Sequence, residues 1–116
     1  DSSEFAFKIA SSIALKKAFQ QAKPYLLEPI MRLAVKVNQK FIGEVIGDII
    51  SRRGHIYNTE TEKEVRSISA YVPLSELFGY VTTLRSLTQG RAISNMEFAY
   101  YQEVPLEITK KIIGRE

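Results

Sequence analysis

Hydrophobic and polar positions follow two different periods along the chain. Residues 33–38 alternate between apolar and small or polar side chains, which is the period of a half-buried strand. Across residues 41–50, apolar side chains instead recur at helical spacing. Arg52 and Arg53 then occupy the expected last turn, and Gly54 occupies the position at which helices commonly end. The first half therefore predicts a strand followed by an amphipathic helix.

The same order of periods repeats in the second half. Residues 56–57 begin a second strand, and the polar run 58–63 predicts a hairpin tip. Residues 67–72 alternate again and predict a third strand. Residues 73–84 place apolar side chains at helical spacing behind a proline, and Gly90 marks the expected end of this helix.

A fourth strand and a terminal helix follow. Residues 96–101 alternate, and Met96, Phe98 and Tyr100 are expected on one face of this strand. Pro105 predicts the start of a short C-terminal helix.

The N-terminal segment, residues 4–22, predicts a further helix. It lacks proline and glycine and is rich in alanine, lysine and glutamine, which are strong helix formers. Pro24 and Pro29 bracket an expected connector to the first strand. Because nothing earlier in the chain covers the wide apolar arc of this helix, we expect a piece of a longer protein.

Two strand–helix–strand units laid end to end predict the fold class. Three pairs of like residues share one spacing, 36 positions, as in a duplicated unit: Gly43 and Gly79, Val45 and Val81, Gly54 and Gly90. Right-handed crossovers place both helices on the same face of a four-stranded antiparallel sheet. We predict an α+β protein with the ferredoxin-like βαββαβ plait, extended by an N-terminal and a short C-terminal helix.

The composition is that of a globular domain without thiol chemistry. The 116 residues are 45% hydrophobic and include no cysteine, which excludes disulfides, thiol catalysis and thiolate metal sites. No stretch approaches the roughly 20 apolar residues of a membrane span, and Asp1 and Glu4 lie where a secretory signal carries lysines. We expect a cytoplasmic protein that binds no membrane. The net charge of +3 permits an anionic partner such as RNA.

Residues for catalysis or cofactor binding are missing from the sequence. His55 is the one histidine, and it lacks the neighbouring ligand spacing of a metal site. No GxxxxGK[ST] loop is present to hold a nucleotide, and Gly43 and Gly47 are interpreted as close-packing points of a helix. The clustered acidic residues indicate a solvated turn: Glu60, Glu62 and Glu64. We expect no catalytic residue, metal or cofactor in this chain.

The aromatic residues of the fourth strand are expected in the core or at the sheet edge: Phe98, Tyr100 and Tyr101. An RNA-recognition motif would stack bases on aromatic side chains of the two central strands. There this chain offers Tyr71 among small or polar residues, so that mode of binding is disfavoured.

Basic residues at the helix ends are the remaining candidates for binding. They form two groups, Arg52 with Arg53, and a set around the second helix stop, Arg85, Ser86, Gln89 and Arg91. Guanidinium forks and loop amides suit phosphate oxygens, and such contacts position a nucleic acid without reading its sequence. The same arginines would complement a helix dipole, and the residues alone favour neither interpretation.

Several runs match one known family in order and spacing over essentially the whole chain. They are residues 1–10, 27–31, 43–48, 51–54, 78–80, 84–91 (LRSLTQGR) and 96–98. These runs resemble bacterial elongation factor G. The resemblance implies that residues 1–23 are the last helix of a truncated domain IV and that residues 24–116 are the ferredoxin-like domain V.

The family consists of ribosomal GTPases that drive tRNA and mRNA through the ribosome. The resemblance implies contacts with the large subunit, at the stalk base and sarcin–ricin loop of 23S rRNA, and with the missing domains of the same factor. GTP and Mg would belong to the absent G domain, and no DNA partner is implied. Arg85, Ser86, Gln89 and Arg91 would face the sarcin–ricin loop, and Arg52 and Arg53 other rRNA or a domain interface.

Two other functions occur on the same fold. A ligand-binding regulatory domain needs a glycine-rich loop between strand and helix, and residues 37–41 contain no glycine. An enzyme of the acylphosphatase type needs an arginine in a phosphate cradle before the first helix, where this chain has Gln39 and Lys40.

Overall fold

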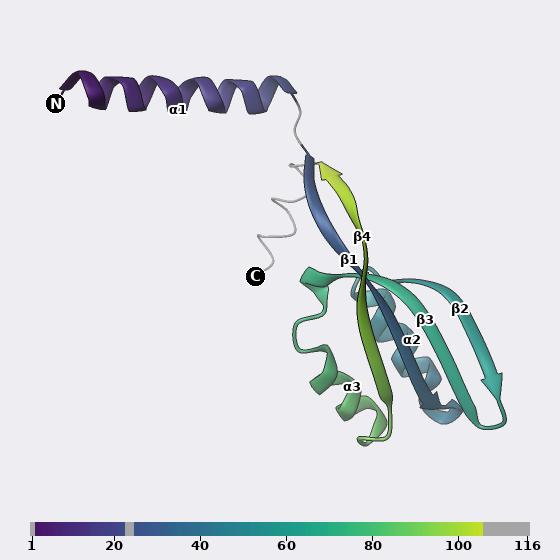
Figure 1. The fold of residues 1–116 in the computed structure, drawn as a ribbon. Coiled ribbons are helices and arrows are strands. Elements are labelled where there is room, and N and C mark those ends of the chain that lie inside the picture. Colours follow the sequence, from purple (N-terminus) through teal and green to yellow (C-terminus); the bar gives the residue numbers. More distant parts are fainter. Residues whose placement is uncertain (1, 23–24, 106–116) are drawn as a thin grey trace. The chain divides into compact units, whose positions relative to one another are not determined.

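The computed structural model describes residues 2–22 and 25–105. The chain divides into two compact units, Glu28–Gln102 and a second unit formed by residues 1–27 and 103–116. The expected division between residues 23 and 24 stays a prediction, and the expected C-terminal helix lies outside the described residues. The elements of Figure 1 are helix α1 (Ser2–Ala22), strand β1 (Tyr25–Asn38), 3-10 turn η1 (Gln39–Phe41), helix α2 (Ile42–Ser51), strands β2 (His55–Glu62) and β3 (Val65–Pro73), 3-10 turn η2 (Leu74–Glu76), helix α3 (Tyr80–Thr88) and strand β4 (Ile93–Pro105).

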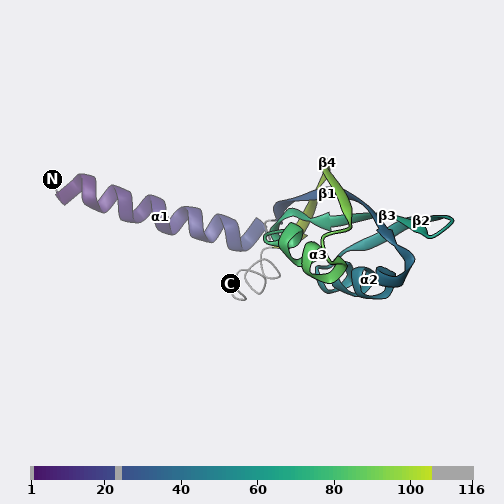
Figure 2. The same ribbon diagram turned by 90° about the horizontal axis from the view of Figure 1, so that it is seen from below.

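The four strands form one sheet in the order β2-β3-β1-β4. Strand β3 pairs antiparallel with both β1 and β2. Helices α2 and α3 lie on the same side of this sheet (Figure 2), so its other side, called the open face below, carries no helix of this unit. The predicted ferredoxin-like plait is confirmed.

The core lies between the sheet and the two helices. The alternation predicted for β1 and β3 is confirmed, because their inward side chains are at most 2% exposed: Leu33, Val35, Val37, Ile68, Ala70 and Val72. The helical layer contributes Phe41, Val45, Ile49, Leu77, Tyr80 and Leu84. Burying each large aliphatic side chain contributes about 1.5–3 kcal/mol, so this layer dominates the stability of the domain.

Two strand boundaries differ from the prediction. Strand β1 begins at Tyr25, so Pro29 lies inside a strand and not in a connector. The ladder between β1 and β3 starts only at Ile30, so Pro29 interrupts none of its pairs with β3. Strand β2 runs to Glu62, so most of the polar segment 58–63 is strand, and the turn is formed by residues 63–64. Its polarity reflects the position of β2 at the edge of the sheet.

The second amphipathic helix starts later than predicted. Residues 74–76 form η2, and α3 begins only at Tyr80. Gly79 precedes it with a φ of 75°, a left-handed conformation that breaks the helix predicted across residues 73–84. As a result, Phe78 and Val81 leave the expected apolar stripe and are 77% and 42% exposed.

The repeated topology does not make the pairs at 36-residue spacing equivalent. Val45 is 1% exposed and Val81 42% exposed. Gly43 is helical, whereas Gly79 is left-handed. The two predicted βαβ units are present, but the residues that share this spacing have different conformations and exposures.

The glycines in α2 and directly after it also have roles that differ from the predicted ones. A Cβ on Gly43 or Gly47 would meet nothing within 4 Å, so their interpretation as close-packing points is wrong. At the helix end Arg53, with a φ of 59°, adopts the left-handed conformation. Gly54 is needed for space instead, because its Cβ would lie 2.5 Å from Ile49 Cγ2 and 2.6 Å from Ile49 O.

Candidate functional site

Two hydrogen bonds and a tight turn fix the C-terminal end of α3, and the basic candidate residues surround this end. Thr88 is fully buried, and its Oγ1 donates to the carbonyl oxygen of Leu84 at 2.7 Å. Gln89 and Gly90 are both left-handed, with φ of 55° and 74°. The Gly90 N–H donates to the carbonyl of Arg85 at 2.9 Å, which closes the last turn. This tight turn fixes the backbone from which the following side chains project.

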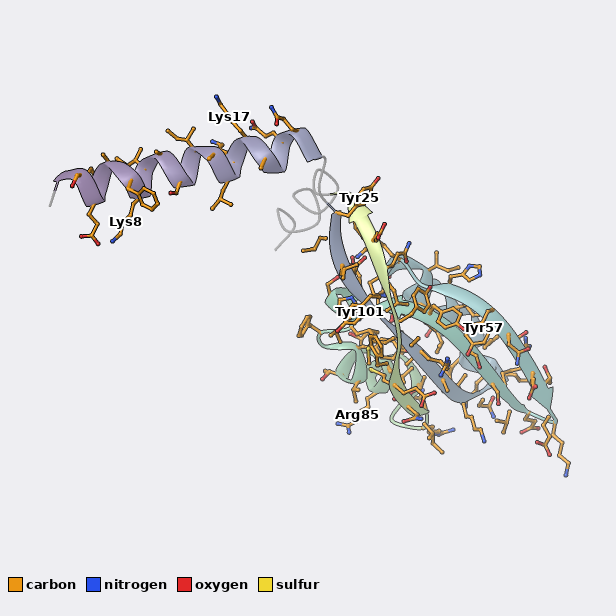
Figure 3. All side chains as sticks on the ribbon, turned by 45° about the horizontal axis from the view of Figure 1, so that its top comes forward. Lys8, Lys17, Tyr25, Tyr57, Arg85 and Tyr101 are labelled. Carbon is orange, nitrogen blue, oxygen red and sulfur yellow. The ribbon has the colours of Figure 1, made fainter. Side chains whose placement is uncertain are left out.

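The predicted residues around this turn lie at the surface. They form the α3-end surface, which consists of Arg85, Ser86, Gln89 and Arg91, all exposed. Arg85 projects from α3 away from the strands (Figure 3). Neither Arg85 nor Arg91 has an ion pair among the residues that the structure describes, so two cations remain available to an anionic partner.

Arg52 is used inside the domain. Its Nε donates to Asp48 Oδ2 at 3.0 Å, and its Nη1 donates to the carbonyl oxygen of Glu76 at 2.6 Å. Its Nη2 reaches Thr83 Oγ1 at 3.2 Å, and the guanidinium lies 5.0 Å from the centre of the Tyr80 ring. Arg52 therefore ties the end of α2 to η2 and to α3.

Arg53 has acidic partners on both sides. Its Nη2 lies 2.6 Å from Glu28 Oε1, and its Nε lies 3.0 Å from Glu76 Oε1. Ser75 Oγ donates to the same Glu28 oxygen at 3.1 Å. Burial lowers the pKa of Arg53, but the hydrogen bonds to Glu28 and Glu76 outweigh this effect, so its pKa is raised. The structure thus separates the two predicted arginine groups into a paired one and an unpaired one.

Phe78 and Val81 were missed as surface residues by the sequence analysis. Val81 and Arg85 are four residues apart in α3, so they share one side of this helix. Phe78 is 77% exposed at the start of this helix. The one sequence signal that could have revealed this exposure is Gly79, which directly follows Phe78 and shifts the helix start.

Other polar candidates do not form a site. His55 lies on strand β2 and is exposed, as are the three clustered acidic residues, Glu60, Glu62 and Glu64. Among the described residues, no group of three or more histidine, cysteine or carboxylate side chains could hold a metal ion. Within the same ranges, no helix has the length and hydropathy to cross a membrane.

The aromatic residues of β4 lie at the sheet edge, one of the two expected places, because β4 is an outer strand in the order β2-β3-β1-β4. Phe98, Tyr100 and Tyr101 are 52%, 44% and 60% exposed, so none of them belongs to the core. Tyr100 contacts Tyr71 on the open face, at 5.5 Å between ring centres, and not the inward side that carries Met96.

Comparison with known proteins identifies the family. A family model described as elongation factor G C-terminus matches residues 25–112. Elongation factor G from Petrotoga mobilis is 51% identical over 118 residues, which cover the whole of this chain and 17% of that protein. A crystal structure from Thermus thermophilus matches 78% of this chain and 14% of its own, with a TM-score of 0.70 and 38% identity. The chain, which spans about a sixth of its relative's length, therefore belongs to the elongation factor G family and corresponds to its C-terminal part.

Proposed function

We propose that this chain is the ribosome-binding module of a translational GTPase that promotes movement of tRNA and mRNA during protein synthesis in the cytoplasm. In this proposal the α3-end surface contacts large-subunit rRNA, at the sarcin–ricin loop, with the stalk base as a second contact. The module itself has no catalytic residue and binds no cofactor. GTP and Mg are bound by a G domain elsewhere in the factor.

The observation that supports this proposal most is the difference between the two arginine groups. Arg52 and Arg53 direct their donors to Asp48, Glu28 and Glu76 inside the domain. Arg85 and Arg91 have no such partners among the described residues. Unpaired guanidinium groups on a fixed backbone suit phosphate oxygens, so we assign RNA contact to the α3-end surface and a positioning role to Arg52 and Arg53.

The proposal predicts weaker binding when the α3-end surface is reversed in charge. Arg85→Glu combined with Arg91→Glu, in the full-length factor, should weaken ribosome binding strongly. The slope of log affinity against log salt should fall by about one for each phosphate that the variant no longer neutralises. Filter binding or light scattering with isolated large subunits at several salt concentrations measures both quantities.

The matched control carries the same change of charge elsewhere. Lys8→Glu combined with Lys17→Glu alters two exposed lysines of α1 (Figure 3). We expect this variant to keep the salt slope of the parent. Equal affinity and slope in the arginine variant and the lysine variant would show that the α3-end surface does not bind rRNA.

A further inference from the structure

Phe78 is the large apolar side chain that is most exposed among the residues that the structure describes, at 77%. Exposure of one apolar side chain is common at protein surfaces. Phe78, however, lies between two residues that are buried in the core, Leu77 at 7% and Tyr80 at 1%. Its exposure therefore follows from the turn that carries it and not from a loose segment.

Residues 77–80 form a tight turn with Phe78 near its tip. The Tyr80 N–H donates to the carbonyl oxygen of Leu77 at 3.1 Å. Gly79, the third residue of this turn, has φ 75° and ψ 4°, which are the values of that position in a type II turn. The turn presents the Phe78 side chain to solvent, while both of its ends are anchored in the core.

Arg52 ties together the segments on the two sides of this turn. Its Nη1 donates to the carbonyl oxygen of Glu76, before the turn, at 2.6 Å. Its Nη2 donates to Thr83 Oγ1, after the turn, at 3.2 Å. Because the backbone on both sides is already fixed, a ligand of Phe78 would not have to order it, which lowers the free-energy cost of binding.

The segment that follows Phe78 carries only positive charge. Residues 77–96 include Arg85 and Arg91 and no aspartate or glutamate. The acidic residue just before this segment, Glu76, is paired with Arg53 at 3.0 Å. An excess of unpaired cations around an exposed ring suits an anionic partner.

The cations are within reach of a ligand that contacts the ring. Helix α3 begins at Tyr80, and Arg85 lies five residues later, about 8 Å along the helix axis. Val81, on the same side of α3 as Arg85, is 42% exposed and continues the apolar surface from Phe78 towards this arginine. One or two nucleotides of an RNA strand could therefore contact both the ring and the guanidinium.

An exposed ring beside phosphate-binding arginines suits an unpaired nucleotide. Proteins hold such nucleotides by stacking the base on an aromatic side chain while cations bind the backbone. A base inside a duplex cannot take part, because its faces are covered by its neighbours. A protein partner would instead need carboxylates opposite Arg85 and Arg91 together with an apolar pocket for Phe78.

We infer that Phe78 stacks on an unpaired base of the same RNA whose phosphates the α3-end surface binds. The inference rests on the proposed function, because it needs RNA at that surface. It adds that this RNA element exposes a base next to the bound phosphates and is not a continuous duplex. Stacking depends little on salt, so Phe78 contributes affinity that remains when the contacts of Arg85 and Arg91 are screened.

Replacing the ring in the full-length factor tests this inference. Phe78→Leu removes the ring but keeps an apolar side chain, so it should weaken binding to isolated large subunits by about fivefold or more. The slope of log affinity against log salt should stay that of the parent, because no charge changes. Phe78→Trp should bind at least as tightly as the parent, since a larger ring stacks on any base.

The matched control is Phe98→Leu, the same change at a half-exposed phenylalanine of β4, which should keep the affinity of the parent. Acylation of ribose 2′-hydroxyl groups in saturated complexes identifies the stacked nucleotide. We expect one nucleotide to be protected by the parent and by Phe78→Trp but not by Phe78→Leu. Parent affinity in Phe78→Leu, or protection that does not depend on the ring, would overturn the inference. Equal weakening by leucine and tryptophan would replace the base with a shaped protein pocket.

The charge-reversed variant separates this inference from the proposed function. Weak binding of Arg85→Glu with Arg91→Glu, together with parent affinity in Phe78→Leu, would overturn the stacking contact alone. Parent affinity in the charge-reversed variant would overturn RNA binding by the α3-end surface and the stacking contact with it.

Discussion

At the scale of single residues, the structure assigns roles that residue type alone does not reveal. The sequence suggested that Gly54 ends α2 through its backbone freedom, but Arg53 adopts the left-handed conformation there. Gly54 is required because Ile49 leaves no room for a side chain. Gly47, inside the same helix, borders open space. We therefore expect the same substitution to have opposite effects on stability at Gly47, inside the helix, and at Gly54, just beyond it.

Alanine at these two glycines tests that difference. Gly54→Ala should lower the free energy of unfolding by about 1–3 kcal/mol, because the Cβ cannot fit without moving backbone. Gly47→Ala should raise it by about 0.5–1 kcal/mol, because alanine loses less backbone entropy in a helix. Urea denaturation of both variants gives the two values. A loss of stability in Gly47→Ala would mean that this position is not open.

Tyr80 predicts a dependence of stability on pH. Burial and the nearby charge of Asp48 raise the pKa of Tyr80 to about 12, against the partial effect of Arg52. The unfolded chain ionises this phenol near its ordinary value of about 10, so the stabilising difference is present below this pH. It is lost as the pH rises towards 12, and the loss approaches about 2.7 kcal/mol.

Comparison with Tyr80→Phe isolates this effect from the titration of other groups. The hydroxyl of Tyr80 has no hydrogen-bond partner in the part of the chain that the structure describes, so its removal should cost little at neutral pH. The difference in unfolding free energy between the parent and the variant should then change between about pH 10 and pH 12. A difference that stays constant over this range would contradict the raised pKa.

At the scale of elements, the hydrophobic period correctly predicted which faces of the regular strands and of α2 are buried. The inward sides of β1 and β3 and the apolar side of α2 were predicted because burial selects one face at a period of two or 3.6 residues. The bulge at Tyr57 in β2, the broken alternation before Tyr100 in β4 and the late start of α3 were not predictable in this way. Each of these irregularities depends on the neighbouring strand or on one left-handed residue. A hydrophobic period describes a whole segment and contains no information about either.

The candidate site was predicted only in part for the same reason. The sequence placed Arg52 and Arg53 at a helix end but could not show that Glu28, 25 positions from Arg53, lies within 2.6 Å of it. Such a long-range ion pair leaves no periodic trace. The solvent exposure of Arg85 and Arg91 agrees with their prediction, while their contact with rRNA stays a prediction.

The paired arginines predict a stability effect without a direct effect on binding. Arg53→Ala should lower the unfolding free energy by about 1–3 kcal/mol, because it leaves the buried carboxylate of Glu28 without its charged donor. Arg85→Ala, on the exposed side of α3, should change it by less than about 0.5 kcal/mol. Thermal unfolding of both variants provides the comparison, and equal effects would remove the distinction between the two arginine groups.

At the scale of the whole molecule, α1 is the element with the least internal support. Its apolar side chains are widely exposed, including Phe5 at 67%, Phe7 at 72% and Leu15 at 63%. Apolar surface of this extent normally marks an interaction site. Its relative from Petrotoga mobilis is about six times as long, so we expect surfaces outside this piece to cover α1 in a full-length factor.

The exposed helix predicts self-association of the isolated chain. Sedimentation velocity should show an average mass that rises with protein concentration. The triple variant Phe5→Ser, Phe7→Ser and Leu15→Ser should abolish this rise, because it replaces exposed apolar side chains of α1 with polar ones. Lys8→Gln, a polar change on the same helix, should leave the rise intact. A parent chain that stays monomeric at high concentration would contradict the prediction.

The buried threonine and the two left-handed residues at the end of α3 have a thermodynamic consequence for any ligand that meets this end. The backbone there is already in one conformation, so association would not have to freeze a loop. Binding driven by counterion release on a rigid scaffold should be favoured by entropy and should show only a small change in heat capacity, unlike recognition that folds a segment on contact.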